Sequence, residues 1–454
     1  MIDRKLDKYI EQHYASNTSA LLLTGARQTG KTFAIRKFAR KNGYNLIELN
    51  FFEDPSACDI FDGVQSTSEV LMRISAYTRK STSSPHTLIF FDEVQQCPKA
   101  VTWVKFLVDE GSCRYALSGS LLGVALHDIA SVPVGYMAVK EVFPLDFEEF
   151  IRVLGISDQV IAALRKCMEE ARSVDDVVHK SLIKAVQLYL VVGGMPAVVQ
   201  TYLDTNDFNA IEAKQREILT LYRWDIGKYD PDHKLNINEI FDLIPSELDA
   251  KNKRFVMKSL NQHARFSRYE DSFLWLKDAG VALPTYNVTE PAVSLKLNEQ
   301  RNLFKLFLND VGLLACQYAA GIQVRLLAGE SEINNGAIYE NFVAQELIAH
   351  GYGGYDHNIY YFNSKKQGEL DFVVEMDGHV VPIEVKSGKD YERHNALKNV
   401  MDNEAYAINR AYVFCNGNVE RNGRVTYLPI YMTMFFEKRP PISAQTYRLD
   451  LSNL

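Results

Sequence analysis

The stretch Ala20–Lys37, ALLLTGARQTGKTFAIRK, joins a short apolar run to a polar loop and then to the start of a helix. Its loop matches the pattern G-x-x-x-x-G-K-[ST], which is typical of a phosphate-binding loop. The glycines let the backbone bend around an oxyanion, and the following helix directs free N–H groups and its positive dipole end at the phosphates. The sequence therefore predicts a nucleotide site at Gly25, Ala26, Arg27, Gln28, Thr29, Gly30, Lys31 and Thr32.

Two side chains of this loop are expected to have chemical roles. Lys31 is expected to reach the β- and γ-phosphates of ATP, and the Thr32 hydroxyl is expected to hold Mg²⁺. The alternative is a strand-to-helix turn that binds nothing. The apolar run Leu21–Leu23 before the loop and the helical spacing of apolar residues after it favour the phosphate loop.

A second stretch, Leu88–Gln95 or LIFFDEVQ, places two carboxylates at the end of an apolar strand. Ligands of parallel sheets collect at the carboxyl ends of the strands. Asp92 is therefore expected to hold the Mg²⁺ that Thr32 binds, and Glu93 is expected to activate the attacking water. Ser120 ends a further apolar strand and is expected to sense the γ-phosphate, although a Ser-Gly-Ser turn without function fits nearly as well.

The N-terminal third of the chain alternates strands with helices. An amphipathic helix is expected up to about Ser19, and a further helix at Ser68–Thr78. Strands are expected at Leu21–Leu23, Tyr44–Phe52, Thr87–Phe91 and Arg114–Ser120. This alternation predicts a parallel sheet with helices on both faces.

Composition sets broad limits. The chain has 454 residues, of which 47% are hydrophobic, and this is enough for about three domains with cores of their own. The net charge of −7 gives little general attraction to nucleic acid or anionic membrane, so such binding requires a local basic patch.

The cysteines and the apolar segments indicate a compartment. The six cysteines have no C-x-x-C spacing, which fits a reducing compartment and gives no zinc framework; they are Cys58, Cys97, Cys113, Cys167, Cys316 and Cys415. Met1–His13 lacks the apolar core of a signal peptide. The longest apolar stretch, Leu188–Val199, is interrupted by glycine and proline and is too short to span a bilayer. We therefore expect a cytoplasmic protein without a membrane partner.

Residues from Phe143 to about Tyr229 show mainly helical periodicity, including Asp146–Leu154 and Val177–Val192. The sequence predicts a helical lid here. Three charged residues in YRWDIGKY face either the nucleotide or a domain interface, and their mixed charge favours the interface; they are Arg223, Asp225 and Lys228.

From Asn236 onward, short helices are expected at Ile237–Ile244 and Lys253–Gln262. Ser267–Glu270 matches a capping box that opens a third helix, and Val281–Val288 follows as a strand. Three short helices and a strand are typical of a winged helix.

This region also contains a run of basic residues without an acid, which we call the basic patch: Lys251, Lys253, Arg254, Lys258, Arg265 and Arg268. Such a run suits contact with DNA phosphates. The third helix mixes basic residues with Glu270 and Asp271, whereas a helix that reads a DNA groove is expected to be more basic. DNA binding and protein docking both remain open for this region.

The C-terminal region combines a helix with a hairpin. Gly336–His350 is expected to be a helix in which Glu340 points toward packed structure. Glu369–Glu375 and Val380–Lys386 alternate as strands, and the Asp377-Gly378 pair between them is a strong signal for a two-residue hairpin turn.

The turn fixes the strand register, because pairing Met376 with His379 places Asp371 opposite Glu384. Facing carboxylates repel, so a divalent cation between them is a natural candidate. Glu340 is expected to add a ligand, and Lys386 to orient a water that attacks a phosphodiester. The alternative is an exposed hairpin with surface charges.

These motifs together resemble the prokaryotic AAA-type P-loop ATPases that carry an uncharacterised C-terminal domain with a restriction-endonuclease-like core. The resemblance rests on GARQTGKT, LIFFDEVQ, the SGS strand end, FPLDFEEF, GGMPAVV, ELDFVVE and PIEVKSG. It covers nearly the full length. Similar sequences often have Gly-Arg before the FPL-type segment, but here Gly135 is followed by Tyr136. If that arginine matters, this protein cycles slowly or uses another residue.

The resemblance implies an α/β fold in four parts: a P-loop ATPase sheet at 1–150, a helical lid at 151–230, a winged-helix region at 231–330 and an endonuclease-like domain at 331–454. It implies ATP and Mg²⁺ as cofactors. It also implies that Glu340, Asp371, Glu384 and Lys386 stand at the positions of the PD-(D/E)xK acids and lysine.

Two hypotheses follow. In the first, the nucleotide state controls a metal-dependent nuclease site that acts on DNA. In the second, the chain is an ATP-driven switch or scaffold whose C-terminal domain binds a partner without cleavage. A protein partner at the winged-helix region is compatible with both, and the sequence gives no oligomeric state.

Overall fold

The computed structural model describes residues 2–83, 86–120, 135–229, 234–318, 321–329, 336–353 and 358–438. The chain forms two compact units. The first contains Met1–Ser157, Gln187–Leu283 and Leu306–Glu330, and the second contains Asp158–Val186, Pro284–Lys305 and Ser331–Leu454. These units differ from the four successive parts expected above, because pieces of the expected lid and winged-helix region group with the C-terminal residues.

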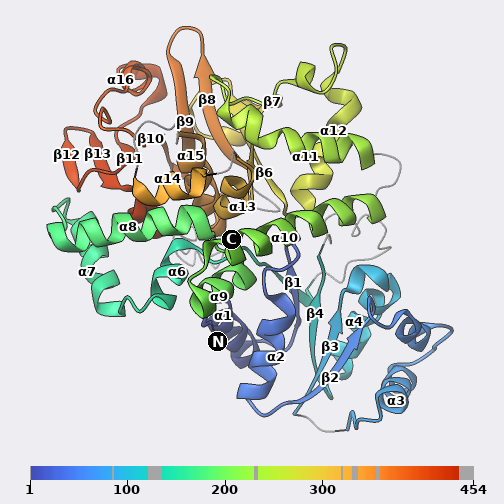
Figure 1. Ribbon diagram of the computed structural model, residues 1–454. Coiled ribbons are helices and arrows are strands. Elements are labelled where there is room, and N and C mark those ends of the chain that lie inside the picture. The colour runs from blue at the N-terminus through green and yellow to red at the C-terminus, as the bar shows by residue number, and fades with distance from the viewer. Residues whose placement is uncertain are drawn as a thin grey trace, which may run out of the picture. The chain divides into compact units, whose positions relative to one another are not determined.

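The first unit is built on a parallel five-stranded sheet in the order β2-β3-β4-β1-β5 (Figure 1). Its strands are β1 (Ala20–Thr24), β2 (Asn45–Asn50), β3 (Thr87–Asp92), β4 (Arg114–Ser118) and β5 (Met137–Glu141). The expected parallel α/β arrangement of this region is confirmed.

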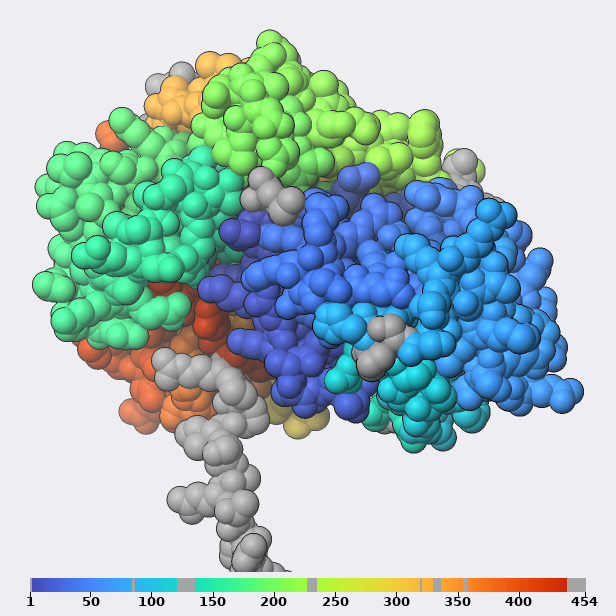
Figure 2. Space-filling model, turned by 90° about the horizontal axis from the view of Figure 1, so that it is seen from below, coloured from blue at the N-terminus to red at the C-terminus, as the bar shows by residue number. Residues whose placement is uncertain are grey.

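Helices cover both faces of this sheet. Leu21 and Leu23 pack with α1 (Lys5–Ser16) and α2 (Lys31–Lys41). Leu22 points the other way, into a core with 3-10 helix η1 (Pro55–Phe61), α3 (Thr67–Thr78) and α4 (Pro98–Glu110). Because successive side chains of a strand alternate between faces, the apolar run of β1 fills both cores. In Figure 2, the blue N-terminal residues form one continuous body.

The strand register brings the predicted motifs to one edge. Leu23 pairs with Ser118, and Phe91 pairs with Leu117, so β1, β3 and β4 end side by side. The loop after β1, the carboxylates after β3 and the serines after β4 therefore converge at the carboxyl ends of the strands.

The remaining helices of the first unit are α6 (Phe147–Val153), α9 (Pro196–Thr205), α10 (Phe208–Tyr229), α11 (Lys234–Asp249), α12 (Phe266–Asp278), α13 (Val311–Gln317) and α14 (Ile322–Ala328). The α8 helix (Asp176–Val192) has residues in both units. At the start of α6, Asp146 and Glu149 cap each other's backbone N–H groups in a capping box. This local signal explains why the expected helix at Asp146–Leu154 is confirmed.

The winged-helix expectation is not confirmed. Lys253–Gln262 is not a helix apart from the 3-10 turn η4 (Met257–Ser259), because Lys253 adopts a left-handed conformation and Val256 N donates to Glu247 Oε2 at 2.7 Å. Ser267 does not cap α12, which begins one residue earlier at Phe266 with no side-chain cap.

The expected strand after α12 exists as β6 (Ala282–Val288), but it is not a wing. It pairs in parallel with β8 (Ile359–Ser364) and therefore extends the sheet of the second unit.

This second sheet is mixed, with the order β12-β13-β11-β10-β9-β8-β6-β7. Its other strands are β7 (Glu299–Leu308), β9 (Gly368–Met376), β10 (His379–Val385), β11 (Ala411–Cys415), β12 (Glu420–Asn422) and β13 (Val425–Pro429). Helices in the unit are α7 (Asp158–Glu169), α15 (Gly336–Ala349) and α16 (Asn395–Met401), with 3-10 turns η5 (Leu295–Asn298), η6 (Glu404–Tyr406) and η7 (Ile430–Phe435). Strands β8 and β10 pack against α15, while α16 contributes to a core that includes residues of β9.

The predicted hairpin is confirmed. Asp377 and Gly378 both have positive φ, at 53° and 79°, as a two-residue turn between twisted strands requires. The antiparallel ladder pairs His379 with Met376 and Ile383 with Phe372. Pro382 is accommodated in the middle of the sheet because the pairing of β10 with β11 begins only at Ile383.

Within the described ranges, no single helix has the length and apolar composition to cross a membrane. Helices α8 and α9 pass that test only when they are taken together across a bend of 115°.

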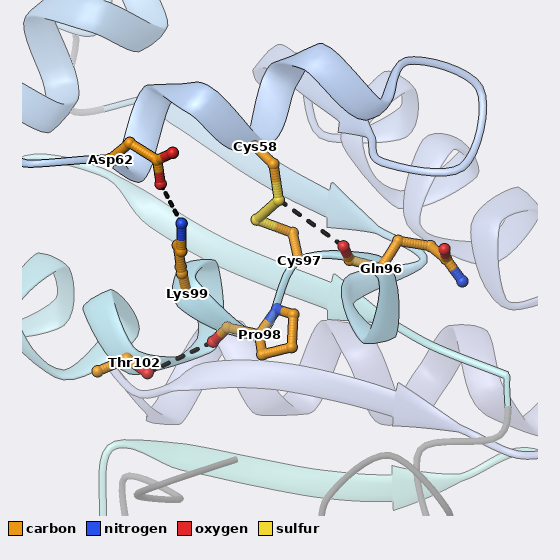
Figure 3. The surroundings of a disulfide bond; sticks show 7 residues. All are labelled: Cys58, Asp62, Gln96, Cys97, Pro98, Lys99 and Thr102. Atoms are coloured by element: carbon orange, nitrogen blue, oxygen red, sulfur yellow. Dashed lines mark hydrogen bonds and ion pairs between the residues drawn. A yellow bond between two sulfur atoms is a disulfide. The ribbon is translucent and has the colours of Figure 1, made fainter. Parts of the chain in front are cut away.

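One pair of cysteines departs from the expectation of unpaired thiols. Cys58 in η1 and Cys97 at the start of α4 form a disulfide (Figure 3). The same two segments are joined by an ion pair between Asp62 and Lys99. The spacing of the cysteines gave no sign of this bond because the fold, and not a local motif, brings together residues 39 positions apart.

This disulfide is expected to stabilise the first unit. Closing a loop of this length restricts the unfolded chain, so Cys58→Ser should lower the free energy of unfolding by about 2–4 kcal/mol in non-reducing buffer. Urea unfolding with and without reductant measures the effect, with Cys167→Ser, a free thiol, as control. A wild-type unfolding curve that reductant leaves unchanged would contradict the bond.

Candidate functional site

Most residues of the predicted phosphate loop line a pocket of about 670 Å³ in the first unit, but Gly25, Ala26 and Thr29 do not. Arg27, Lys31, Thr32, Asp92 and Glu93 all contribute to its wall. Helices α1 and α9 complete it with Arg4, Pro196 and Gln200. The volume lies within the range of sites for small ligands and cofactors.

The backbone of the loop requires its glycines. Gly25 has φ +115°, and a Cβ there would lie 2.3 Å from the carbonyl oxygen of Val142. Gly30, with φ +93°, forms the left-handed N-cap of α2. Gln28 is exposed and also left-handed, whereas the Thr29 hydroxyl is buried and donates to Ala26 O at 2.9 Å. The loop is therefore a well-defined turn that leads directly into the N-terminus of α2, where backbone amides can bind an anion.

Lys31 is buried and folds back on the loop. Its Nζ donates to the carbonyl oxygens of Gly25 at 2.9 Å and Ala26 at 2.7 Å. Burial lowers the pKa of Lys31 to about 8, although the negative charges of Glu93 and Asp92 act to raise it. Backbone carbonyls are neutral partners, so the oxygens of a phosphate would replace them at a gain in attraction.

Asp92 is held by polar neighbours from three elements. Thr32 Oγ1 lies 3.1 Å from both carboxylate oxygens, Asn50 Nδ2 donates at 3.3 Å, and the Ser118 hydroxyl donates to Oδ1. Burial, together with the charge of Glu93, raises the pKa of Asp92. A hydroxyl beside a buried carboxylate is a donor set that fits Mg²⁺, which prefers oxygen ligands.

Glu93 has a strained backbone at the pocket wall. Its φ and ψ are 56° and 49°, in the left-handed region that residues with a side chain seldom adopt. Its Oε2 accepts hydrogen bonds from the Ser120 hydroxyl, at 2.9 Å, and from the Gln95 amide. The expected γ-phosphate sensor Ser120 therefore contacts the expected general base.

Three further residues support the loop, and the sequence gave no signal for the first two. Arg4 donates to Thr29 O at 3.3 Å and to Phe143 O at 3.0 Å, so it ties the N-terminal helix to the loop. A Cβ on Gly280, just after α12, would lie 3.0 Å from Ala26 N.

The third is Asp225, which lies 3.0 Å from Arg27 Nη1. Of the two alternatives for Asp225, nucleotide or interface, this contact places it beside the phosphate loop. Its neighbour Arg223 does pair with Asp242 on α11, while the side chain of Lys228 lies outside the described residues.

The C-terminal residues form a second cluster. The observed ladder of β9 and β10 ends with the pair Phe372 and Ile383. One residue further on, the same register sets Asp371 opposite Glu384. Asp371 Oδ2 accepts from Val385 N at 2.8 Å, and Lys386 Nζ lies 2.7 Å from Glu384 Oε2. Glu340 is buried, as its position on α15 predicted.

Lys305 on β7, which the sequence analysis missed, lies inside this cluster. It is fully buried, and its Nζ lies 3.2 Å from Glu340 Oε2, 2.8 Å from Glu369 Oε1 and 3.9 Å from Asp371 Oδ1. Burial alone would lower the pKa of Lys305, but the three carboxylates outweigh it and raise the pKa. An internal ammonium therefore offsets part of the negative charge of these acids.

The joint binding of a divalent cation by Glu340, Asp371 and Glu384 stays a prediction. Among the residues that the structure describes, no three acidic, histidine or cysteine side chains are arranged to hold a metal ion. Positive charge lies beside both facing carboxylates, since Lys305 is near Asp371 and Lys386 is paired with Glu384. Burial, and then the charge of Asp371, raise the pKa of Glu384, while the neighbouring ammonium of Lys386 opposes this rise.

Comparison with known families divides the chain into three matches. Residues 17–151 match a family described as an AAA domain. Residues 183–324 and 335–432 match two domains of unknown function, DUF8612 and DUF4143. No curated protein is similar in sequence at a significant level.

Several solved structures are similar over much of the chain. The Walker-type ATPase PabY2304 of Pyrococcus abyssi is 15% identical with a TM-score of 0.43, covering 70% of this chain and 96% of its own. Aeropyrum pernix Orc1 in complex with DNA is 14% identical with a TM-score of 0.31, covering 73% and 93%. Cdc6p of Pyrobaculum aerophilum is 13% identical with a TM-score of 0.26, covering 72% and 93%. At these TM-scores, the similarity adds nothing to the AAA-domain match.

The AAA-domain match and the loop geometry agree. The N-terminal part of the chain is a P-loop ATPase domain, and its fold implies a nucleotide that usually binds with Mg²⁺.

Lys305 is expected to be essential for the stability of the second unit. Lys305→Met leaves buried carboxylates without their counter-charge, so the free energy of unfolding should fall by about 3–5 kcal/mol. Urea unfolding measures this free energy, and Lys296→Met, at an exposed lysine, is the matched control. A loss no larger than that of the control would mean that the ammonium is not needed there.

Proposed function

We propose that this protein binds ATP and hydrolyses it at the pocket around Lys31. The observation that carries the proposal is the convergence of Lys31, Thr32, Asp92 and Glu93 on one pocket wall, at the carboxyl edge of a parallel sheet. A phosphate loop alone accounts for binding, whereas a carboxylate next to it accounts for turnover.

Each residue then has one task. The loop amides and Lys31 bind the phosphates, and Glu93 accepts a proton from the water that attacks the γ-phosphorus. Thr32 and Asp92 would hold Mg²⁺, which neutralises charge on the phosphate oxygens. Ser120 keeps the Glu93 carboxylate in place through its hydrogen bond.

We propose further that the nucleotide state controls the C-terminal domain. In one form of this proposal, that domain is a DNA-cleaving site that uses Glu384 and Lys386. In the other, it binds a partner without cleavage. The ammonium of Lys305 among the carboxylates favours the second form, because it already offsets part of the charge that a metal ion would otherwise balance.

DNA is a candidate partner through the basic patch. Lys251, Lys258, Arg265 and Arg268 are exposed, and neutralising DNA phosphates with such residues makes binding salt-dependent. A protein partner on the same region is the alternative.

Hydrolysis has a direct test. Glu93→Gln should lower ATP turnover by about a hundredfold or more while ATP affinity changes less than about threefold, because only the proton acceptor is lost. Lys31→Ala should weaken ATP binding itself. Phosphate release and calorimetric titration measure the two effects. Wild-type turnover that survives Lys31→Ala would overturn the proposal.

The basic patch is tested by charge reversal. Lys258→Glu with Arg265→Glu should weaken duplex DNA binding by about tenfold or more at low salt, and should flatten its salt dependence. Fluorescence anisotropy measures both. The matched control is Lys365→Glu with Lys366→Glu, two exposed lysines of the second unit. Equal losses in both double variants would indicate general charge attraction instead of a patch.

The same DNA, incubated with protein and Mn²⁺, separates the two forms of the C-terminal proposal. We expect no cleavage with or without ATP. Cleavage that Asp371→Asn and Glu384→Gln abolish would establish the nuclease form.

A further inference from the structure

A salt bridge joins the phosphate loop to helix α10. Arg27 Nη1 lies 3.0 Å from Asp225 Oδ1, and the two side chains are only 20% and 10% exposed. The Arg27 guanidinium also lies over the ring of Phe52, 5.2 Å from its centre. One turn earlier on α10, the Tyr222 hydroxyl is directed at Arg27 O, 3.5 Å away. Helix α10 therefore contacts the loop at two positions that lie one helical turn apart.

Hydrogen bonds extend these contacts from Arg27 to Glu93, the expected general base. Arg27 Nε donates to Ser120 Oγ at 3.4 Å, and Ser120 Oγ donates to Glu93 Oε2 at 2.9 Å. A hydroxyl has one proton to give and lone pairs to accept with, so the two bonds are compatible and their direction is fixed. Asp225, Arg27, Ser120 and Glu93 form one chain of polar contacts from α10 into the pocket.

We propose that Asp225 is a positioning residue for ATP hydrolysis. It holds the Arg27 guanidinium in the pocket wall, and through Ser120 it fixes the orientation of the Glu93 carboxylate toward the attacking water. The inference rests on the proposed ATPase function. It adds a residue of the helical region, far from the loop in sequence, to the machinery that sets the rate of turnover.

A purely structural salt bridge is the competing explanation, and the chain contains a suitable comparison. Arg223, two residues before Asp225, pairs with Asp242 on α11 at 2.7 Å. That pair is 39% and 52% exposed and does not line the pocket. Exposed pairs of this kind contribute little to stability and have no route to the reacting atoms.

The test compares Asp225→Asn with Asp242→Asn in the full chain. Asp225→Asn should lower kcat for ATP by about tenfold or more with KM changed less than about threefold, because a misplaced base affects the chemical step more than ground-state binding. Asp225→Glu should recover most of the rate. Asp242→Asn should stay within about twofold of wild type.

A second variant breaks the chain of contacts without touching the salt bridge. Ser120→Ala should lower kcat as Asp225→Asn does, and the double variant should lose little more than either alone, because both act through Glu93. If Asp225→Asn folds poorly, Asp225→Glu takes its place in the double variant, and Ser120→Ala alone still tests the link to Glu93.

Two results would overturn the inference. One is a kcat within about twofold of wild type in Asp225→Asn or in Ser120→Ala. The other is a rate loss in the double variant equal to the product of the single losses. Wild-type protein that turns over no ATP would instead remove the proposed function itself, so the two failures are distinguishable.

Discussion

A lysine ammonium buried in a protein needs oxygen partners, and each unit of this chain encloses one such group. Lys31 is paired with the backbone carbonyls of Gly25 and Ala26, which are neutral. Lys305 is paired with the carboxylates of Glu340 and Glu369, which are charged. Phosphate oxygens attract an ammonium more strongly than neutral carbonyls do, so Lys31 is available to a polyphosphate, whereas Lys305 is already neutralised.

This difference assigns different tasks to the two clusters. Around Lys31, the carboxylates of Asp92 and Glu93 are arranged beside a pocket that a nucleotide can fill. Around Lys305, carboxylates form ion pairs with the ammonium groups of Lys305 and Lys386. The hairpin of β9 and β10 was expected to bind a metal ion, whereas its acids already have lysine partners in the structure.

The sequence was sufficient wherever a local pattern dictated the structure. The phosphate loop, the strand that ends in Asp92, the capping box of α6 and the Asp377-Gly378 hairpin all follow from residues a few positions apart. The helix expected at Lys253–Gln262 failed because a left-handed residue and a tertiary hydrogen bond to Glu247 override its periodicity.

Contacts between distant segments were beyond the reach of one sequence. Nothing near Asp225 indicates that it meets Arg27, and nothing near Lys305 indicates that β7 carries it into the acidic cluster. The winged-helix pattern failed for the same reason, since β6 pairs with a strand that follows much later in the chain.

We infer that, within the described part of the chain, Thr32 and Asp92 form the cation site and Lys305 takes the place of a cation among the C-terminal acids. Crystals grown with Mn²⁺ and a non-hydrolysable ATP analogue test it through anomalous scattering. We expect a manganese peak beside Thr32 and Asp92 and none at the hairpin of β9 and β10. A peak bound by Asp371 and Glu384, or none at Thr32, would contradict it.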